Sequence, residues 1–392
     1  MSMRKLITIL TGLTLWVGLA IPVQSQGALG IQVLETNTGS ARSIGMGGVP
    51  LPYADGLSAV HNPSGYAFQF TDRLVSFSQA EKTAWLTEFT NDLYLKQSSF
   101  GVGYSLSQLK PERKSRLDIS VGLAYTNLKF DYGTMYVTDE GGVVIDTVNP
   151  NDKISAYTFS VGFSYYLELG VGVNHKKVSG GFVIGGRPQE FVTASTNISD
   201  VAFCARLPIH ELLPRMLNVN NNPYFPLGFK LTPFISRVES GDNNKYLYQS
   251  DRVSSALPEI VHKTRGFDLS AEIGNAPLLS LSYGTDDQEL TVEDDLSNAD
   301  REGTEIGLAG TFFIRSGSYK STDDDINIDT DGWGLSSRGL VDWLIARKVI
   351  RPTGNLLGYL LNRVEIRYDH AKYSTDNSAI DNTKFNTFSI RL

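Results

Sequence analysis

Residues 155–166 read Ser-Ala-Tyr-Thr-Phe-Ser-Val-Gly-Phe-Ser-Tyr-Tyr, and this stretch decides the fold. Large apolar side chains occupy the odd positions from Tyr157 to Tyr165, while Thr, Ser and Gly occupy the even positions between them. Side chains of a β-strand point alternately to its two faces, so the stretch predicts a strand with one apolar face and one small, polar face. We therefore expect β-structure wherever this pattern repeats.

The alternation repeats along most of the chain. It is found at residues 100–107, 118–125, 169–173, 267–273, 306–314, 364–369 and 387–392. In the last of these segments Phe388, Ile390 and Leu392 are the apolar residues. Apolar residues at the last, third-last and fifth-last positions resemble the terminal signal that the barrel assembly machinery recognises, although Leu392 stands where Phe is commonest. The barrel assembly machinery is therefore an expected partner.

Two architectures produce such alternation, a soluble β-sandwich or propeller and a transmembrane β-barrel. The outward face of a sandwich is usually polar because it meets bulk water. Here the second face is Gly, Ser and Ala in the earlier strands and charged in a later one, where Glu365, Arg367 and Asp369 alternate with apolar residues. Small and charged residues suit a barrel lumen, where these three charges are expected to point. The pattern favours an all-β fold, an antiparallel transmembrane β-barrel, with the soluble sandwich or propeller as the alternative.

Tyrosines near the predicted strand ends support the barrel. Aromatic residues gather at membrane–water interfaces, and a girdle of this kind is expected from Tyr104, Tyr125, Tyr157, Tyr165 and Tyr283.

The first 25 residues resemble an export signal. Arg4 and Lys5 precede an apolar run over residues 6–21, and small residues lead to a cleavage point that we place after Ser25. A membrane anchor is the alternative, but sixteen residues are few against the roughly 20 of a spanning helix. No later segment offers eighteen apolar residues without a charge. We expect an integral protein of the Gram-negative cell outer membrane, in contact with outer-membrane lipid.

The overall composition hides these two faces. The 392 residues have a mean hydropathy of −0.14 and a net charge of −7, with a single cysteine, Cys204. The charge argues against a nucleic-acid-binding protein, and one cysteine excludes an internal disulfide framework. A mean near zero is what the apolar and polar faces of a barrel would give together.

Acidic residues cluster at 286–305 and 322–332, and both segments are predicted to be extracellular loops. The acids singled out are Asp286, Asp287, Asp294, Asp295, Asp323, Asp324 and Asp325. The spacing Asn327-x-Asp329-x-Asp331-Gly332 resembles the start of a calcium loop, but Arg338 stands where the bidentate Glu is required. A solvated acidic loop is the favoured interpretation. Residues 209–213, 338–349 and 355–362 are predicted to form short helices in loops or at the rim.

Catalytic motifs are not found. Five histidines are present, yet the sequence contains no HExxH, no G-x-S-x-G and no phosphate-binding glycine loop. A Ser–His pair brought together by the fold stays open. We expect no enzyme activity, no catalytic residues, no cofactor and no metal.

A dense element precedes the first predicted strand, between residues 40 and 67. Three glycines allow close backbone approach, an aspartate can cap a short helix, and Asn62-Pro63 can fix a turn. Apolar and small residues are too frequent here for a flexible linker. The residues expected to matter are Met46, Gly47, Gly48, Asp55, Ser58, Asn62, Pro63 and Gly65.

This element resembles the opening of the FadL-like superfamily of outer-membrane barrels, especially its PorV/PorQ branch. The matching motifs are Met46-Gly47-Gly48, Ala54-Asp55, Ser58-Ala59 and Asn62-Pro63-x-Gly65. Gly56 replaces the family's second acid, and Ser64 replaces an alanine. The resemblance implies a barrel of 14 strands over residues 71–392, whose lumen is plugged by residues 26–70.

Two kinds of function follow from the resemblance. PorV-type barrels act with the type IX secretion system and engage secreted protein cargo, so secretion-system components and cargo proteins would be partners. FadL-type barrels take up long-chain fatty acids or other hydrophobic molecules. The acidic segments favour the PorV-like interpretation, with FadL-type transport and a purely structural barrel as alternatives.

Overall fold

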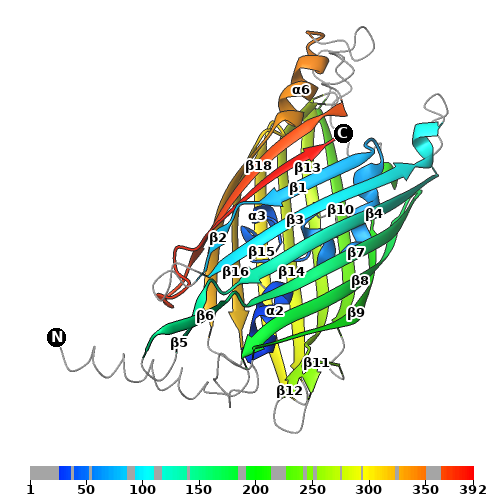
Figure 1. Cartoon of the computed structure of the whole chain (residues 1–392). Coiled ribbons are helices and arrows are strands. Elements are labelled where there is room, and N and C mark those ends of the chain that lie inside the picture. The colour runs from blue at the N-terminus through cyan, green and yellow to red at the C-terminus, as the bar shows by residue number, and fades with distance from the viewer. Residues whose placement is uncertain are drawn as a thin grey trace.

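The computed structural model describes residues 26–36, 39–52, 55–85, 93–109, 117–138, 142–183, 191–212, 227–241, 245–249, 254–273, 276–292, 295–322, 326–349 and 363–392. They form a closed β-barrel around a short N-terminal plug (Figure 1). The wall strands are β1 Val75–Ala80 with its continuation β2 Thr83–Ala84, β3 Tyr94–Ser105, β4 Asp118–Asp131, β7 Asn151–Ser164, β8 Glu168–Val183, β9 Phe191–Arg206, β10 Leu227–Gly241, β13 Glu259–Ile273, β14 Ala276–Val292, β15 Asp295–Leu308, β16 Phe312–Ser321, β17 Asn327–Ser336, β18 Glu365–Ser374 and β19 Lys384–Arg391.

Smaller elements lie inside and around this wall. The plug contains α2 Gln26–Thr36, α3 Ala41–Ile44 and the 3-10 helices η2 Ser58–Val60 and η3 Pro63–Phe70. Connections contain η4 Leu106–Leu109, α4 Ile209–Leu212 and α6 Ser337–Ala346, and the two hairpins β5 Met135–Thr138 with β6 Val144–Val148 and β11 Tyr246–Gln249 with β12 Ser254–Ala256.

The barrel closes through its first strand. β1 pairs antiparallel with β19 on one side and with β3 on the other, and β2 extends the same position along β3. The 15 strands of the sheet therefore fill 14 positions, because β1 and β2 share one. The expected 14-stranded antiparallel barrel is confirmed.

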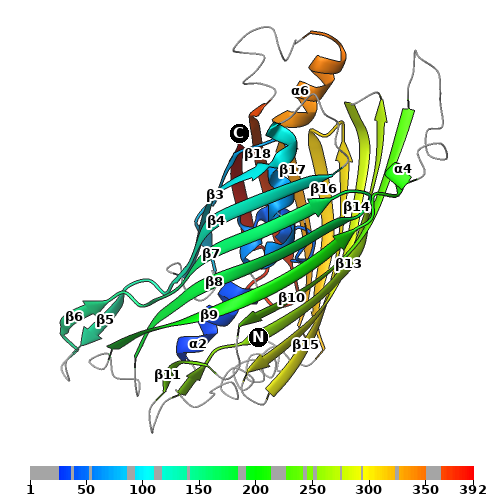
Figure 2. The same ribbon diagram turned by 90° about the vertical axis from the view of Figure 1, so that its right-hand side faces the viewer.

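The two ends of the barrel differ. One end carries the C-terminal Leu392, whose backbone pairs with Val75, and the helix α6; we call it the terminal end. The opposite, distal end carries the hairpins β5–β6 and β11–β12 (Figure 2).

The terminal half of the wall is apolar outside and polar inside. On β7 Tyr157, Phe159 and Phe163 are 60%, 45% and 40% exposed, whereas Thr158 and Ser160 between them are buried. The outward residues of this kind form a ring that we call the apolar belt: Phe100, Val102, Tyr104, Val121, Leu123, Tyr125, Tyr157, Phe159, Phe163, Val171, Val173, Val201, Phe203, Ile235, Leu269, Ile306, Leu308, Ile314, Trp333, Leu335, Ile366, Phe388 and Leu392. The alternation predicted at 155–166 is therefore confirmed.

Toward the distal end the polarity reverses. On β4 the inward residues change from Gly122 and Ala124 to Leu128 and Phe130, while Lys129 points outward. The inward apolar residues pack with two residues of α2, Ile31 and Leu34, to form a distal core. A wall that is polar outside and apolar inside is built for water, so the distal half extends beyond the bilayer.

The predicted acidic loop at 286–305 is wrong. Most of it is the hairpin of β14 and β15, in which Asp286 points into the lumen and Asp287 points outward. Asp295 opens β15, while Asp294, Asp323, Asp324 and Asp325 lie outside the described residues. The physical reason is the reversed polarity, because strands that stand in water carry charges as loops do.

Two further predictions need correction. The alternating segment 306–314 is not one strand, because Ala309 and Gly310, with φ of 52° and 61°, turn the chain between β15 and β16. Residues 327–332 belong to β17, so the calcium-loop alternative has no loop to form it.

The short helices agree in part with prediction. α4 lies within the predicted segment 209–213, and α6 overlaps the predicted segment 338–349 from one residue earlier. Ser336 caps α6 by accepting a hydrogen bond from the Arg338 amide at 3.1 Å. The segment 355–362 lies outside the described residues. Within the described ranges, none of the helices has the length and hydropathy needed to span a membrane.

A discontinuity interrupts the wall between β9 and β10. β9 pairs with β8 along its whole length, but with β10 only from Val201 to Arg206. The part of β9 from residue 191 to residue 200 therefore has no strand partner on its β10 side among the described residues. We call this feature the wall step.

Candidate functional site: a plugged lumen and an open strand edge

Glycines of the wall create the space in which the plug lies. The inward positions of β3, β4, β7 and β8 include Gly101, Gly103, Gly122, Gly162 and Gly172. A Cβ at Gly172 would overlap the backbone of Pro63, and one at Gly103 would overlap the Phe70 ring. The small lumen face predicted from the sequence is therefore the surface on which η3 packs.

The Met46-Gly47-Gly48 motif packs against the opposite side of the lumen. Met46 is fully buried, and Gly47 and Gly48 adopt positive φ of 70° and 76°. Gly303 and Gly317 face each other across β15 and β16, and a Cβ at either position would overlap the backbone of the motif. A second pair of wall glycines thus receives this turn.

Asp55 and Asn62 fix the backbone between the two packed regions. The Asp55 Oδ1 atom accepts hydrogen bonds from the amides of Leu57 and Ser58, both at 3.2 Å. The Asn62 Oδ1 atom accepts from the Ser64 amide at 3.2 Å and so caps η3, with Pro63 in the first turn. Gly65 is buried within η3.

Asn62 also ties the plug to the wall. Its amide nitrogen donates to the Pro50 carbonyl at 2.7 Å and to Ser236 of β10 at 3.2 Å. The residues singled out from the sequence therefore lie together in the lumen, where they hold the plug in one conformation.

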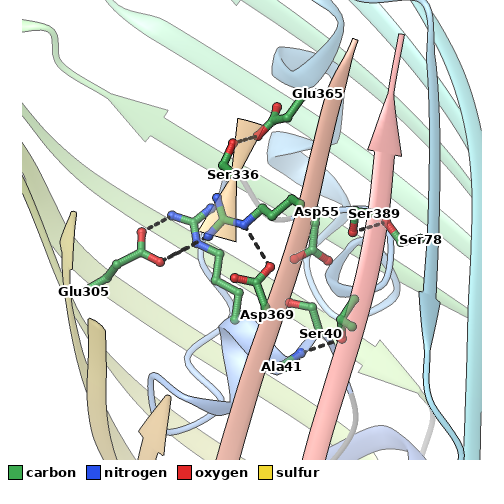
Figure 3. A network of polar contacts seen from close by, with 12 residues as sticks. Ser40, Ala41, Asp55, Ser78, Glu305, Ser336, Glu365, Asp369 and Ser389 are labelled. Carbon is green, nitrogen blue, oxygen red and sulfur yellow. Dashed lines mark hydrogen bonds and ion pairs between the residues drawn. The ribbon is translucent and has the colours of Figure 1, made fainter. Parts of the chain in front are cut away.

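A network of buried charges lies beside the plug (Figure 3). Arg315 is fully buried, with Nε 2.6 Å from Glu305 and Nη2 2.7 Å from Asp369. Arg367 pairs with Asp369 at 2.8 Å, and Arg42 of the plug pairs with Glu305 at 2.8 Å. One arginine of the plug is thus joined to wall strands that the sequence separates by more than 250 residues.

Glu365 belongs to a neighbouring pair. It lies 2.8 Å from Arg73 and accepts a hydrogen bond from Ser336 at 2.9 Å. The three lumen charges expected from the sequence, Glu365, Arg367 and Asp369, all point inward. The sequence did not lead us to predict Glu305, Arg315 and Arg42 as lumen residues. A signal was available for the first two, because their odd-numbered positions lie opposite the outward apolar residues Ile306 and Ile314.

A second polar cluster anchors α2 at the distal end. The Lys176 ammonium lies 2.6 Å from Glu35 of α2 and 2.7 Å from Asp200 of β9. Asp200 also accepts a hydrogen bond from Ser240 of β10 at 2.8 Å. The cluster therefore joins the plug, β8, β9 and β10 at the point where the wall step begins.

His61 is a titratable group of the plug between these clusters. Desolvation lowers the pKa of His61 well below its ordinary value, and the positive charges of Lys176, His262 and Arg301 lower it further. The imidazole is therefore neutral while the plug is docked.

A small cavity lies beside the plug. It has a volume of about 10 Å³ between α3 and the wall, and its lining includes Thr36, Gly48, Arg301 and Tyr373. This is room for roughly one water molecule, so this cavity admits no larger molecule.

At the wall step, part of β9 has no strand partner on its β10 side among the described residues, although β11 lies close to it. The Leu207 amide donates toward β10, to the Pro233 carbonyl at 2.9 Å, and the Asn197 carbonyl accepts from the Lys245 ammonium at 3.0 Å. Backbone groups along a strand alternate in direction, so Thr193, Ser195 and Asn197 point theirs to the unpartnered side. These residues form the open edge of β9.

Among the residues that the structure describes, no three His, Cys, Asp or Glu side chains are placed to hold a metal ion. His262 contacts Asp286 at 2.6 Å inside the lumen, next to Thr264, and both side chains are buried.

No protein-family model matches the sequence, and no curated protein is significantly similar to it. Solved structures resemble the fold. The toluene transporter TodX of Pseudomonas putida is 10% identical, with 90% of this chain and 96% of that chain covered and a TM-score of 0.40. A FadL homologue of Pseudomonas aeruginosa is 12% identical (91% and 97% covered, TM-score 0.35), and the β domain of the Bordetella autotransporter BrkA is 9% identical (81% and 98% covered, TM-score 0.39).

With TM-scores of this size, the class of the protein rests on its own strand pairing. Backbone that crosses lipid must satisfy all its hydrogen bonds internally, which a closed barrel does. The closed wall, the apolar belt and the polar, plugged interior make this chain an integral β-barrel of the Gram-negative outer membrane.

Proposed function

We propose that this plugged barrel is a secretion-associated protein of PorV-like type that engages exported polypeptides at its distal end. The observation that carries the proposal is the open edge of β9. An unpaired strand edge is a template on which an extended segment of another chain can add as a further strand.

The position of the edge suits this role. It lies in the distal half of the wall, where the outer face is polar and stands in water. The distal end carries two hairpins and the part of the wall that extends beyond the bilayer, and we assign it to the cell exterior because outer-membrane barrels extend further from the membrane on that side. An exported chain would meet the open edge of β9 without entering the lipid.

The plug supports the same proposal, because it packs inside the lumen and so favours the outside of the barrel as the surface that contacts a partner. Residues 286–305 belong largely to the β14–β15 hairpin, so the open edge of β9, and not an acidic loop, is the proposed contact surface. Secretion-system components and cargo proteins are the proposed partners, and the barrel assembly machinery would insert the chain.

FadL-type uptake of hydrophobic molecules is the second candidate. It is favoured by the distal core, because departure of α2 with Ile31 and Leu34 would leave an apolar chamber in the distal lumen. Transport would require the plug to move, since the described cavity holds about one water molecule.

The test removes the gene from its host and compares surface and released proteins, with uptake of labelled fatty acid measured in the same cells. We expect loss of a set of exported proteins and unchanged uptake. The wild-type gene and Ser195→Ala should restore export. Ser195→Pro should fail, because proline removes an amide at the open edge while the β8 ladder keeps its hydrogen bonds.

An unchanged set of exported proteins together with reduced fatty-acid uptake would overturn the proposal in favour of transport. Equal rescue by Ser195→Pro and Ser195→Ala would remove the open edge as the binding surface. Heat-modifiable gel migration checks that each variant is folded.

A further inference from the structure

The outer face of the barrel repeats one pattern where the apolar belt ends. Moving along a strand toward the distal end, an apolar residue is followed two positions later by a polar residue and four positions later by a lysine. On the opposite side of the barrel the pattern occurs once, as Phe267-Arg265-Lys263 in β13. It also occurs in six strands that lie side by side, as Phe100-Ser98-Lys96 in β3, Tyr125-Asn127-Lys129 in β4, Tyr157-Ser155-Lys153 in β7, Val173-His175-Lys177 in β8, Tyr368-His370-Lys372 in β18 and Phe388-Asn386-Lys384 in β19. We call these lysines the lysine row.

These strands are neighbours. They occupy six of the seven consecutive wall positions from β8 to β18, and the seventh is β1. Lys96, Lys129 and Lys153 lie directly opposite one another across β3, β4 and β7. Lys372 and Lys384 are opposite one another across β18 and β19. The lysine row therefore follows roughly half of the circumference, just beyond the distal limit of the apolar belt.

Such an arrangement is unfavourable in isolation. Cβ atoms of directly opposed residues lie about 5 Å apart, and like charges at that separation repel. Asp131 offsets part of the repulsion, at 3.3 Å from Lys96 and 3.0 Å from Lys129. Lys153 and Lys177 have no acidic partner among the described residues, so the repulsion calls for negative charge from outside the chain.

The height of the row identifies where that charge comes from. Four residues of strand span about 13 Å, which a tilt of about 40° reduces to about 10 Å above the belt. The headgroup layer extends roughly 5–8 Å beyond the hydrocarbon. A lysine side chain can bend back over the remaining distance, with its stem along apolar surface and its ammonium at the headgroups.

The opposite side of the barrel shows that position alone does not select lysine. Four residues beyond the belt on β14, β15 and β17 stand Asp287, Glu302 and Asp329, all exposed. Lys263 of β13, which also lies on this side, pairs with Glu289. Acidic and basic residues are therefore mixed on the opposite side, whereas lysine predominates along the lysine row.

A groove adds a defined pocket to the row. It has a volume of about 350 Å³ on the outer face of β7, β8 and β9, and its lining includes Lys153, Ser155, Lys177, Ser179 and Ser195. Two ammonium groups and three hydroxyls are the donors that a phosphate group requires.

We propose that the lysine row binds phosphate groups of membrane lipids in the leaflet at the distal interface, and that Lys153 and Lys177 hold one such headgroup in the groove. The row spans strands from β18 to β8, just above the belt, which matches a bilayer surface better than a single bound protein segment. With the distal end outside the cell, the phosphates are those of the outer leaflet.

The test measures retention of a phosphorylated lipid by the full-length barrel. The purified protein in detergent is titrated with lipid A, and bound lipid is counted by native mass spectrometry. Lys153→Gln/Lys177→Gln should weaken retention about thirtyfold, from the contribution of each lysine near an anionic surface. Lys263→Gln/Lys320→Gln removes two exposed lysines from the opposite side and should leave retention unchanged.

Two further arms distinguish the source of the phosphate. Phosphatidylcholine, whose headgroup is neutral overall, should be retained weakly by the wild type and equally by both variants. Inorganic phosphate at equal concentration should not displace lipid A; efficient displacement would indicate a site for free phosphate and overturn the lipid assignment. Equal retention of lipid A by both double variants would overturn the proposal.

Discussion

The Lys176 ammonium lies 2.6 Å from the Glu35 carboxylate, and this ion pair joins the N-terminal helix α2 to wall strand β8. Both side chains are buried, as is Asp200, the second carboxylate on Lys176. The lysine is thus shared between the plug and the wall, and its two partners are not equivalent.

The first prediction concerns this cluster. Lys176→Met leaves two buried carboxylates without a cation and should destabilise α2 docking by about 3–5 kcal/mol. Glu35→Gln should cost less, because Asp200 still neutralises Lys176. Limited proteolysis of the plug in folded barrels measures the difference, and greater sensitivity of Glu35→Gln than of Lys176→Met would contradict it.

Close packing of the plug gives a second prediction. Gly172→Val places side-chain atoms where the Pro63 backbone lies, so the plug should be displaced from an otherwise closed wall. Conductance of single barrels in planar bilayers should rise. Val171→Ala, on the outer face of the same strand, should conduct as the wild type does, and a silent Gly172→Val barrel would show that the plug tolerates the overlap.

The charge network near the terminal half gives a third. Arg315→Leu removes the partner shared by Glu305 and Asp369 and should lower stability by about 3–5 kcal/mol. Arg315→Lys keeps the charge without the fork of donors and should recover part of this loss. The temperature at which gel migration changes should fall in the order wild type, Arg315→Lys, Arg315→Leu. Equal midpoint temperatures would refute a stabilising role for Arg315.

A fourth prediction follows from the pKa of His61, which is lowered while the plug is docked. The released histidine has an ordinary pKa near 6.5. Below about pH 6.5 the released form therefore gains a proton that the docked form does not bind. Plug docking should be fully stable above that pH and weaken progressively as the pH falls.

The pH dependence of plug docking is tested by limited proteolysis of the plug at a series of pH values. They run from about 5 to about 8, the range in which histidine titrates. His61→Gln, which does not titrate, should show a flatter profile than the wild type. Identical profiles would assign the pH response to other groups.

The fifth prediction locates the membrane boundary. Phe159→Arg places a charge in the apolar belt and should destabilise the inserted barrel by about 2–4 kcal/mol. Ser155→Arg lies four residues further along the same strand, outside the belt but directly opposite Lys177, and the repulsion should cost less than about 1 kcal/mol. Folding into lipid vesicles under a urea titration compares the two, and equal effects would move the boundary.

The alternation of side chains made most of the wall predictable. Tyr157 and Phe159 can be placed on the lipid-facing side without knowing their partners in other strands. The alternation of side chains depends only on neighbouring residues of the same strand. The turn at Ala309 and Gly310 could not be predicted from the alternation, because the apolar residues Leu308 and Phe312 continue the pattern on both sides of it. The number of acidic residues wrongly placed Asp286 in a loop for a different reason. The sequence does not show that its carboxylate points into the lumen and contacts His262.

The site was predictable only where a residue acts on its own neighbours. Asp55 and Asn62 cap local backbone, and their sequence signatures describe that role. The pairing of Arg42 with Glu305 depends on barrel closure, which brings together residues 263 positions apart. The wall step is also a property of register, and no single segment of β9 or β10 encodes it.

The reversal of polarity along each wall strand has a consequence for assembly. If β4 slipped by one residue, Lys129 would enter the distal core, and at the same moment Leu123 would leave the lipid for the lumen. The two errors arise at opposite ends of one strand and their free-energy costs add, so both ends of each strand favour the correct register. In a barrel with the same polarity from end to end, a register shift would cost free energy only in the part of the wall that crosses the membrane.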